Sequence, residues 1–136
     1  MLKSALNFYW ARRLPSDLMY VTETTFRFTT DTYLEPDFVF YPKAIGIPGL
    51  SAATARLVVE IADTSLGYGL GRKAALYASF GIAELWVIDA VRLDTHLHHE
   101  PSADGYRRIR TLSKEERLVP EAAPALAVTL GDLELY

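Results

Sequence analysis

The stretch RLVVEIADTSLGYGLGRKAALY, residues 56–77, decides the fold of this chain. It opens with Leu57–Ala62, an apolar run that contains a single carboxylate, Glu60. Such a run is typical of a strand buried on both faces of a sheet, and a charge in that setting is costly unless a partner compensates it. An amphipathic helix follows and carries Lys73 near its start. A buried acid followed by a lysine on the next helix is the feature that the rest of the sequence has to explain.

The composition is that of a globular protein. The 136 residues suit one domain, 1–136, and half of them are hydrophobic while 23% are charged, which excludes a disordered chain. No apolar run reaches the roughly 18 residues of a membrane span, and the N-terminal residues lack the pattern of a secretion signal. The absence of cysteine excludes disulfides and thiolate metal ligands. We therefore expect a cytoplasmic protein without a membrane segment.

The net charge of −3 is mildly acidic. It argues against a surface coated for non-specific nucleic-acid binding, which has a basic excess. It does not exclude a catalytic site for nucleic acid, because bound metal ions supply positive charge there.

Hydrophobic periodicity predicts the remaining elements. Apolar residues spaced by three and four indicate helices, and alternating residues indicate half-exposed strands, of which 92–98 has the pattern of an edge strand. The predicted helices cover residues 2–13 and about 70–80, and the predicted strands cover 20–29, 38–41, 57–62, 84–89, 92–98 and 106–112. Residues 125–130 would add a short strand or close the sheet edge. Because a crossover helix joins two buried strands, the sequence predicts an α/β fold with a mixed central β-sheet flanked by helices.

Two carboxylates are expected to meet at one end of this sheet. Asp37 opens the strand before the one that contains Glu60, and Glu60 lies near the end of its own strand. If the two strands pair antiparallel, the start of one lies beside the end of the other. Neighbouring carboxylates repel each other, and hard oxygen ligands of this kind suit Mg²⁺ or Mn²⁺. Lys73 would reach the same point from its helix, where a lysine can orient a metal-bound water or stabilise charge on a phosphate.

Each of these residues also has a purely structural interpretation. A Pro-Asp pair usually marks a turn, a strand glutamate can face solvent at an edge, and a helical lysine usually faces water. Asp63, three residues after Glu60, is either near the metal or part of an Asx turn.

Two further groups are candidates for binding. His96 and His98 point to one face of a strand, which suits a transition metal, but no third ligand is placed near them; an exposed sheet edge is the alternative. Arg108 and Arg110 share one face of the returning strand, which suits contacts with phosphates; a solvated hairpin is the alternative.

The ordered motifs of the chain resemble those of a known family. The resemblance is carried by VEIADTS (59–65), GRK (71–73), LYA (76–78), GI (81–82) and ELWVID (84–89). These segments are similar to the motifs of the Uma-two (Uma2) family, bacterial restriction-endonuclease-like proteins of the PD-(D/E)xK nuclease superfamily. EPD at 35–37, followed by an apolar strand, is similar to the upstream motif of that family. The resemblance covers about residues 33–130.

The resemblance implies a restriction-endonuclease-like fold and Mg²⁺-dependent hydrolysis of phosphodiester bonds in DNA. It implies that Asp37 and Glu60 are catalytic metal ligands and that the backbone carbonyl of Ile61 adds a ligand. It also implies that Lys73 is the catalytic lysine, displaced from the strand onto the helix. Ala62 stands where an E-x-K motif would place that lysine.

A nuclease of this kind would contact DNA, and the chain offers residues for that contact. Arg72, beside Lys73, is a predicted DNA contact together with Arg108 and Arg110. The aromatic-rich segment at 20–28 and the apolar start of the chain point to a possible homodimer.

Two departures from the family motivate a second hypothesis. Gly69 stands where members usually have an acid before the lysine. Members also usually have a segment before the first helix, with an acid that can join the site, for which Glu23 or Glu35 would have to substitute. The second hypothesis is a degenerate, non-catalytic nuclease fold that serves as a binding or assembly module.

Overall fold

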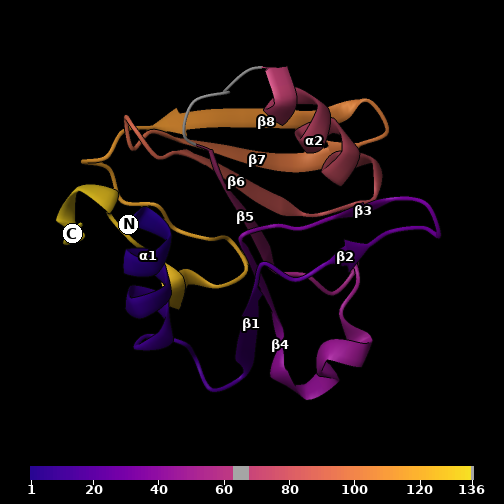
Figure 1. Cartoon of the computed structure of the whole chain (residues 1–136), viewed down its shortest axis with the longest axis horizontal. Coiled ribbons are helices and arrows are strands. Elements are labelled where there is room, and N and C mark those ends of the chain that lie inside the picture. Colours follow the sequence, from indigo (N-terminus) through magenta and orange to yellow (C-terminus); the bar gives the residue numbers. More distant parts are fainter. Residues whose placement is uncertain (63–67, 136) are drawn as a thin grey trace.

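A six-stranded mixed sheet forms the centre of the molecule in the computed structural model (Figure 1). The model describes residues 1–62 and 68–135, and the predicted turn with Asp63 lies outside them. The strands follow the order β1 (Leu18–Thr22), β4 (Phe38–Pro42), β5 (Leu57–Ala62), β6 (Glu84–Asp89), β7 (Thr95–Ser102) and β8 (Gly105–Leu112).

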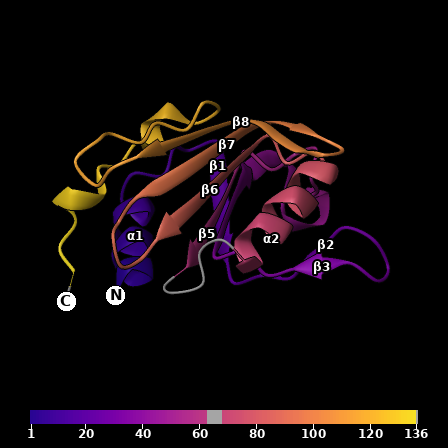
Figure 2. The same ribbon diagram turned by 90° about the horizontal axis from the view of Figure 1, so that it is seen from above.

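Helices lie on both faces of this sheet. Helix α1 (Leu2–Ala11) and the C-terminal segment lie on one side, and α2 (Tyr68–Ser79) lies on the other (Figures 1 and 2). Short 3₁₀ helices occupy Lys43–Ile45, Ile47–Gly49, Pro124–Leu126 and Leu130–Asp132. In the described part of the chain, no helix has the length and apolar character that a membrane span requires. The predicted α/β architecture with a mixed central sheet is confirmed.

The strand pairings explain how the opening stretch is used. β4 pairs antiparallel with β5, and β5 pairs parallel with β6. Parallel neighbours need a crossover connection, and α2 supplies it between β5 and β6. Gly81 follows α2 with a φ of 84°, a left-handed conformation that suits glycine,. The sequence from 57 to 89 is therefore a βαβ unit.

The face of the sheet that carries α1 holds the larger core. Leu2, Leu6 and Trp10 recur at a spacing of four and are buried against the sheet. The ring of Trp10 packs edge-on against Phe38 at a centroid distance of 5.0 Å. Its Nε1–H donates to the carbonyl of Leu126 at 2.9 Å. The C-terminal segment therefore covers this face beside α1.

The opposite face is covered by α2 and by the hairpin of β2 (Phe26–Arg27) and β3 (Tyr33–Leu34). Tyr77 of α2 is fully buried over Val58 and Val87 of the sheet. Phe28 of the hairpin packs edge-on against Tyr77 at 5.9 Å. Figure 2 shows the hairpin and α2 on the same side of the sheet.

The predicted strand at 20–29 is wrong, because it is two strands in two different sheets. β1 pairs with β4 from Leu18 to Thr22, where its partner is Phe38. Phe38 is the first residue of β4, so the ladder ends there, apart from a hydrogen bond of 3.3 Å from the N–H of Glu23 to the backbone carbonyl of Asp37. Glu23 then adopts a left-handed φ of 52° and turns the chain into the β2–β3 hairpin. Local alternation does not reveal where a partner strand stops.

The strand predicted at 92–98 is confirmed from Thr95 onward, but its predicted place at the sheet edge is wrong. Asp89 accepts backbone hydrogen bonds from Val91 and Arg92, and the strand begins only at Thr95. β7 then lies between β6 and β8, so β8 forms the edge. The segment around Leu118 forms an isolated bridge to Val128 and covers a face of the sheet, rather than adding a strand to it.

Candidate active site

The two predicted carboxylates lie together at one end of the sheet. The register pairs Phe38 with Val59, so one further step along both strands sets Asp37 opposite Glu60. Because side chains alternate along a strand, both point to the face that carries α2. Asp37 Oδ2 accepts a hydrogen bond of 2.7 Å from the backbone N–H of Ile61, the residue after Glu60.

Glu60 is buried and has partners from α2. Its side chain is 6% exposed. The hydroxyl of Tyr77 donates to Glu60 Oε1 at 2.7 Å, and Lys73 Nζ lies 3.8 Å from Oε2. Burial raises the pKa of Glu60, while the Tyr77 hydrogen bond and the charge of Lys73 lower it without cancelling the effect of burial,. The carboxylate is therefore held in a setting that favours a cation nearby.

Lys73 and Tyr77 reach Glu60 from one face of the same helix. They are four residues apart, which places their side chains above one another. Lys73 lies in the second turn of α2 and is 47% exposed, whereas Tyr77 is buried. Burial, followed by the charge of Glu60, raises the pKa of Tyr77 well above its ordinary value, so its hydroxyl remains a donor at neutral pH. Gly69 lies within the first turn of α2.

A second lysine reaches the acids from α1. Lys3 Nζ lies 3.1 Å from Asp37 Oδ1 and also forms a close ion pair with Glu23. Partial burial lowers the pKa of the Lys3 ammonium, but the hydrogen bonds to Glu23 and Asp37 outweigh it, and the pKa is raised. Glu23, one of the two candidates for an additional acid at the site, therefore lies near Asp37. Glu35 instead contacts the hydroxyl of Thr25 at 3.4 Å.

The oxygen atoms at this end of the sheet, from two carboxylates and a backbone carbonyl, are of the kind that a hard divalent cation takes as ligands. The N–H of Ile61 points toward Asp37, and in a strand the carbonyl of a residue points to the same side as its N–H. Among the described residues, no group of three or more histidine or acidic side chains has the geometry of a metal site. Two carboxylates are nonetheless enough for Mg²⁺, which keeps several waters and uses substrate phosphates as ligands.

The predicted arginines do not converge on the acids. Arg72 is exposed beside Lys73. Arg108 and Arg110 lie on β8, three strands from β5, which is roughly 14 Å at the usual strand spacing. Arg108 also forms an ion pair with Glu121, with 2.6 Å between Nη2 and Oε1.

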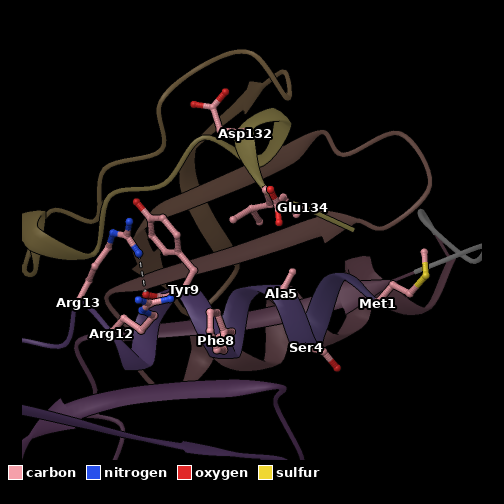
Figure 3. A pocket seen from close by; sticks show the side chains of 10 residues that line it. Met1, Ser4, Ala5, Phe8, Tyr9, Arg12, Arg13, Asp132 and Glu134 are labelled. Carbon is pink, nitrogen blue, oxygen red and sulfur yellow. Dashed lines mark hydrogen bonds between the residues drawn. The ribbon is translucent and has the colours of Figure 1, made fainter. Parts of the chain in front are cut away.

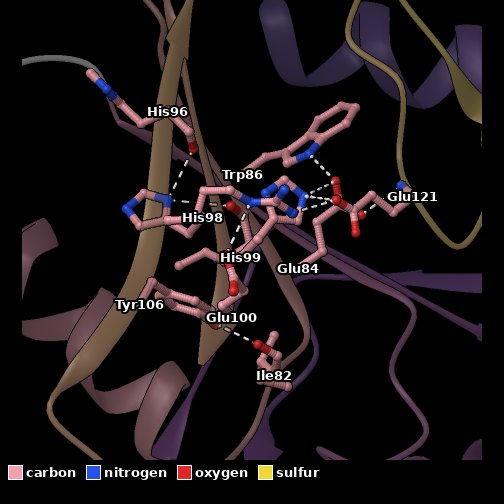
Figure 4. A network of polar contacts seen from close by, with 11 residues as sticks. Ile82, Glu84, Trp86, His96, His98, His99, Glu100, Tyr106 and Glu121 are labelled. Atoms are coloured by element: carbon pink, nitrogen blue, oxygen red, sulfur yellow. Dashed lines mark hydrogen bonds and ion pairs between the residues drawn. The ribbon is translucent and has the colours of Figure 1, made fainter. Parts of the chain in front are cut away.

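The histidines of β7 have separate partners and do not form one site (Figure 4). His96 Nδ1 lies 2.9 Å from the hydroxyl of Thr111. His98 is buried, and its Nδ1 lies 3.0 Å from the carbonyl of His96. Burial lowers the pKa of His98, which keeps the ring neutral. The alternative prediction, that His96 and His98 lie on an exposed edge strand, is wrong because β7 lies between two other strands of the sheet.

The neighbouring His99 belongs to a buried polar network with Glu84 (Figure 4). Glu84 Oε2 accepts from Trp86 Nε1 at 2.8 Å, and Glu84 Oε1 accepts from the N–H of Glu121 at 2.9 Å. His99 Nε2 lies 3.1 Å from Glu84 Oε2, an ion-pair contact without hydrogen-bond geometry. This network ties the C-terminal segment to the sheet.

A cavity of about 910 Å³ lies between α1 and the C-terminal segment (Figure 3), and neither Asp37 nor Glu60 lines it. It is lined by Phe8, Tyr9 and Arg12 on the outer side of α1 and by Asp132 and Leu133 of the C-terminal segment. The acid pair lies instead at the end of the sheet, where β4 and β5 meet.

The fold belongs to a class that includes nuclease-like proteins. One solved structure, described as a "putative nuclease belonging to DUF820" from Anabaena variabilis ATCC 29413, is similar with a TM-score of 0.68. The two sequences are 15% identical, and the match covers 96% of this chain and 76% of that chain. The chain itself belongs to the Uma2 family, whose model, described as "Putative restriction endonuclease", matches residues 3–131. No curated protein matches the chain.

Sequence reasoning missed two residues that contact the acids. Tyr77 is a buried residue whose sequence position carries a signal, because a residue four positions after Lys73 shares its face of the helix, which is the face toward Glu60,. Lys3 carried no such signal, because its place beside Asp37 depends on how α1 packs on the sheet.

Proposed function

We propose that this chain is a metal-dependent nuclease that hydrolyses phosphodiester bonds of DNA, with Mg²⁺ as cofactor and Mn²⁺ as a substitute. The observation that carries the proposal is the meeting of Asp37, Glu60 and Lys73 at one end of β4 and β5. Membership of the Uma2 family and the nuclease-like fold support it.

The residues divide the work of hydrolysis between them. Asp37 and Glu60, with the carbonyl of Ile61, would hold the cation. A cation there lowers the pKa of bound water and neutralises charge on the phosphate. Tyr77 fixes Oε1 of Glu60 and so orients the carboxylate,.

Lys73 has the freedom that a catalytic lysine needs. Its ammonium lies 3.8 Å from Glu60 Oε2, which is beyond hydrogen-bond distance, and its side chain is half exposed. It would orient the attacking water and stabilise the negative charge that builds on the phosphate as the P–O bond to the leaving oxygen breaks. Arg72, exposed beside it, would contact the DNA backbone. Arg108 is less suited to that contact, because Glu100 and Glu121 already pair with it.

Cleavage of plasmid and single-stranded DNA tests the proposal. With Mg²⁺, wild-type protein should cleave, and Glu60→Ala and Lys73→Ala should each lower the rate by about 100-fold or more. Glu115→Ala and Lys114→Ala are matched controls, because both residues are exposed outside the site. Absence of cleavage with Mg²⁺, Mn²⁺ and other divalent ions on several substrates would contradict the proposal.

A non-catalytic binding or assembly module is the second candidate. The observation that favours it is the ion pair between Lys3 and Asp37, because a resident ammonium already compensates one of the acids. Titration of the folded protein with Mn²⁺ separates the two. Saturable binding that Asp37→Asn abolishes supports the nuclease, whereas no binding supports the module.

A further inference from the structure

We propose that Lys3 is a built-in counter-ion of the acid site, and that a divalent cation has to displace it from Asp37 in order to bind. This inference rests on the proposed metal site. It makes Lys3 a positioning residue that sets the metal concentration at which the site fills.

The position of Lys3 is fixed by the helix that carries it. Its neighbour Leu2, together with Leu6 and Trp10, is buried in the core. The hydroxyl of Tyr9 donates to the carbonyl of Ala127 at 2.7 Å. These contacts hold α1 in one rotation about its axis, and the side chain of Lys3 is only 28% exposed. The side chain of Lys3 is therefore partly buried and directed at the acids.

Both oxygens of Asp37 are engaged, each by a different donor. Oδ2 accepts the backbone N–H of Ile61 at 2.7 Å, and Oδ1 lies 3.1 Å from the ammonium of Lys3. The N–H of Ile61 is part of the strand, so it stays in place. A metal ion that approaches Asp37 therefore competes with Lys3, and the two like charges repel within a few ångströms.

Glu23 gives the displaced lysine a second partner. It forms an ion pair with Lys3, and its own N–H donates to the backbone carbonyl of Asp37 at 3.3 Å. Its left-handed φ of 52° places it where β1 leaves the sheet. The backbone of Glu23 is thus tied to Asp37, while its carboxylate is 70% exposed. Lys3 can leave Asp37 and keep Glu23, so displacement does not strand an unpaired ammonium.

Calorimetric titration of the full chain with Mn²⁺ at low ionic strength tests the inference. Lys3→Met keeps the length and apolar stem of the side chain and removes the charge, and it should bind Mn²⁺ about tenfold more tightly than wild type. Lys3→Gln should shift the affinity in the same direction, and Lys3→Arg should bind like wild type or more weakly. Arg12→Gln is the matched control. It removes a positive charge from the C-terminal end of α1, over the ring of Phe8 and away from the acids, and should leave the affinity unchanged.

The outcomes separate this inference from the proposed function. Tighter binding by Lys3→Met, or binding that appears only in Lys3→Met, supports the counter-ion role. Equal or weaker binding by both neutral variants, with wild-type protein still binding Mn²⁺, overturns the role of Lys3 and leaves the metal site standing. Absence of Mn²⁺ binding in wild type and in every Lys3 variant overturns the metal site and this inference with it. Circular dichroism spectra that match wild type establish that the variants are folded.

Discussion

Two buried glutamates on neighbouring strands have opposite surroundings. Glu60 on β5 and Glu84 on β6 each accept a hydrogen bond from an aromatic side chain, at 2.7 Å from Tyr77 and at 2.8 Å from Trp86. Both glutamates are nearly inaccessible, with 5% and 3% of their surface exposed. Burial and an aromatic donor are therefore not what distinguishes them.

The remaining partners distinguish the two acids. Glu84 is also bound by the backbone N–H of Glu121 and lies against His99, and both of these groups are fixed inside the protein. Glu60 has instead a half-exposed lysine at 3.8 Å and a second acid, Asp37, opposite it. A carboxylate enclosed by fixed donors holds the fold together, whereas a carboxylate beside a half-exposed lysine and a second acid has the surroundings of a ligand site,.

The largest expected effect is on metal binding, which should depend on the pair of Asp37 and Glu60 and not on Glu84. Asp37→Asn should lower the affinity for Mn²⁺ by about 100-fold or more, because it removes a charged ligand. Glu84→Gln should bind Mn²⁺ as wild type does. Calorimetric titration of both variants checks this, and equal losses in the two would erase the distinction between the acids.

The stability of the fold should depend on Glu84, the acid that does not affect metal binding. Glu84→Ala leaves Trp86 Nε1 and the N–H of Glu121 without their acceptor, and it should destabilise the fold by about 2 kcal/mol. Urea unfolding followed by tryptophan fluorescence gives the free energy of unfolding. Glu115→Ala, at an exposed position, serves as the control. A change below about 0.5 kcal/mol, the usual range for surface positions, would mean that the network does not anchor the C-terminal segment.

Tyr77→Phe sharpens the comparison at the level of a single hydrogen bond. It keeps the ring in the core and removes the donor to Glu60 Oε1, so we expect a loss of about 1 kcal/mol in stability. The affinity for Mn²⁺ should fall about tenfold, because Glu60 loses the group that orients it. Tyr106→Phe is a matched control, since Tyr106 donates to the carbonyl of Ile82, outside the acid site. Unchanged Mn²⁺ affinity in Tyr77→Phe would leave Tyr77 with a packing role alone.

The smallest effect concerns pH and the metal-free protein. Burial raises the pKa of Glu60 in the folded state above the value of the unfolded chain. The folded protein therefore holds this proton more tightly, and the associated stability is fully present below the unfolded pKa and is lost as the pH rises through the folded pKa. Glu60→Gln is neutral throughout and should escape that loss.

Thermal unfolding in a chelating buffer, from about pH 4 to pH 8, measures this difference. Wild type and Glu60→Gln should be closest at the acidic end, and the variant should have the higher Tm at neutral pH. If the Tm values of the two proteins changed with pH in parallel, burial would not raise the pKa of Glu60. A gain in stability on loss of the acid is the pattern expected where a site is kept for function.

The fold and the acid pair followed from the sequence for a physical reason. Residues 57–62 and 84–89 have apolar residues on both faces, and only a strand in the middle of a covered sheet can bury both faces. The helix between these two strands makes the connection a crossover, so the strands are parallel. An antiparallel partner before them then brings Asp37 to Glu60, because antiparallel pairing sets the start of one strand against the end of the next.

The parts that escaped prediction depend on contacts between distant segments. The end of β1 is set by where β4 begins, and the place of β7 inside the sheet is set by β8. Lys3 reaches Asp37 across 34 residues of sequence through the packing of α1. Local periodicity carries no information on any of these, since each depends on a partner elsewhere in the chain.

The arginines of β8 have a consequence for how the protein behaves at high concentration. β8, a strand of eight residues, has a strand neighbour on one side only among the described residues, and Ile109 on it is 56% exposed. Such an edge invites a strand from another molecule. Arg107 and Arg110 lie on either side of the isoleucine in the sequence and carry like charges, so two such edges that approach each other would repel,. Arg110, which the sequence predicts as a DNA contact, would thus also keep the sheet from pairing edge to edge with a second molecule.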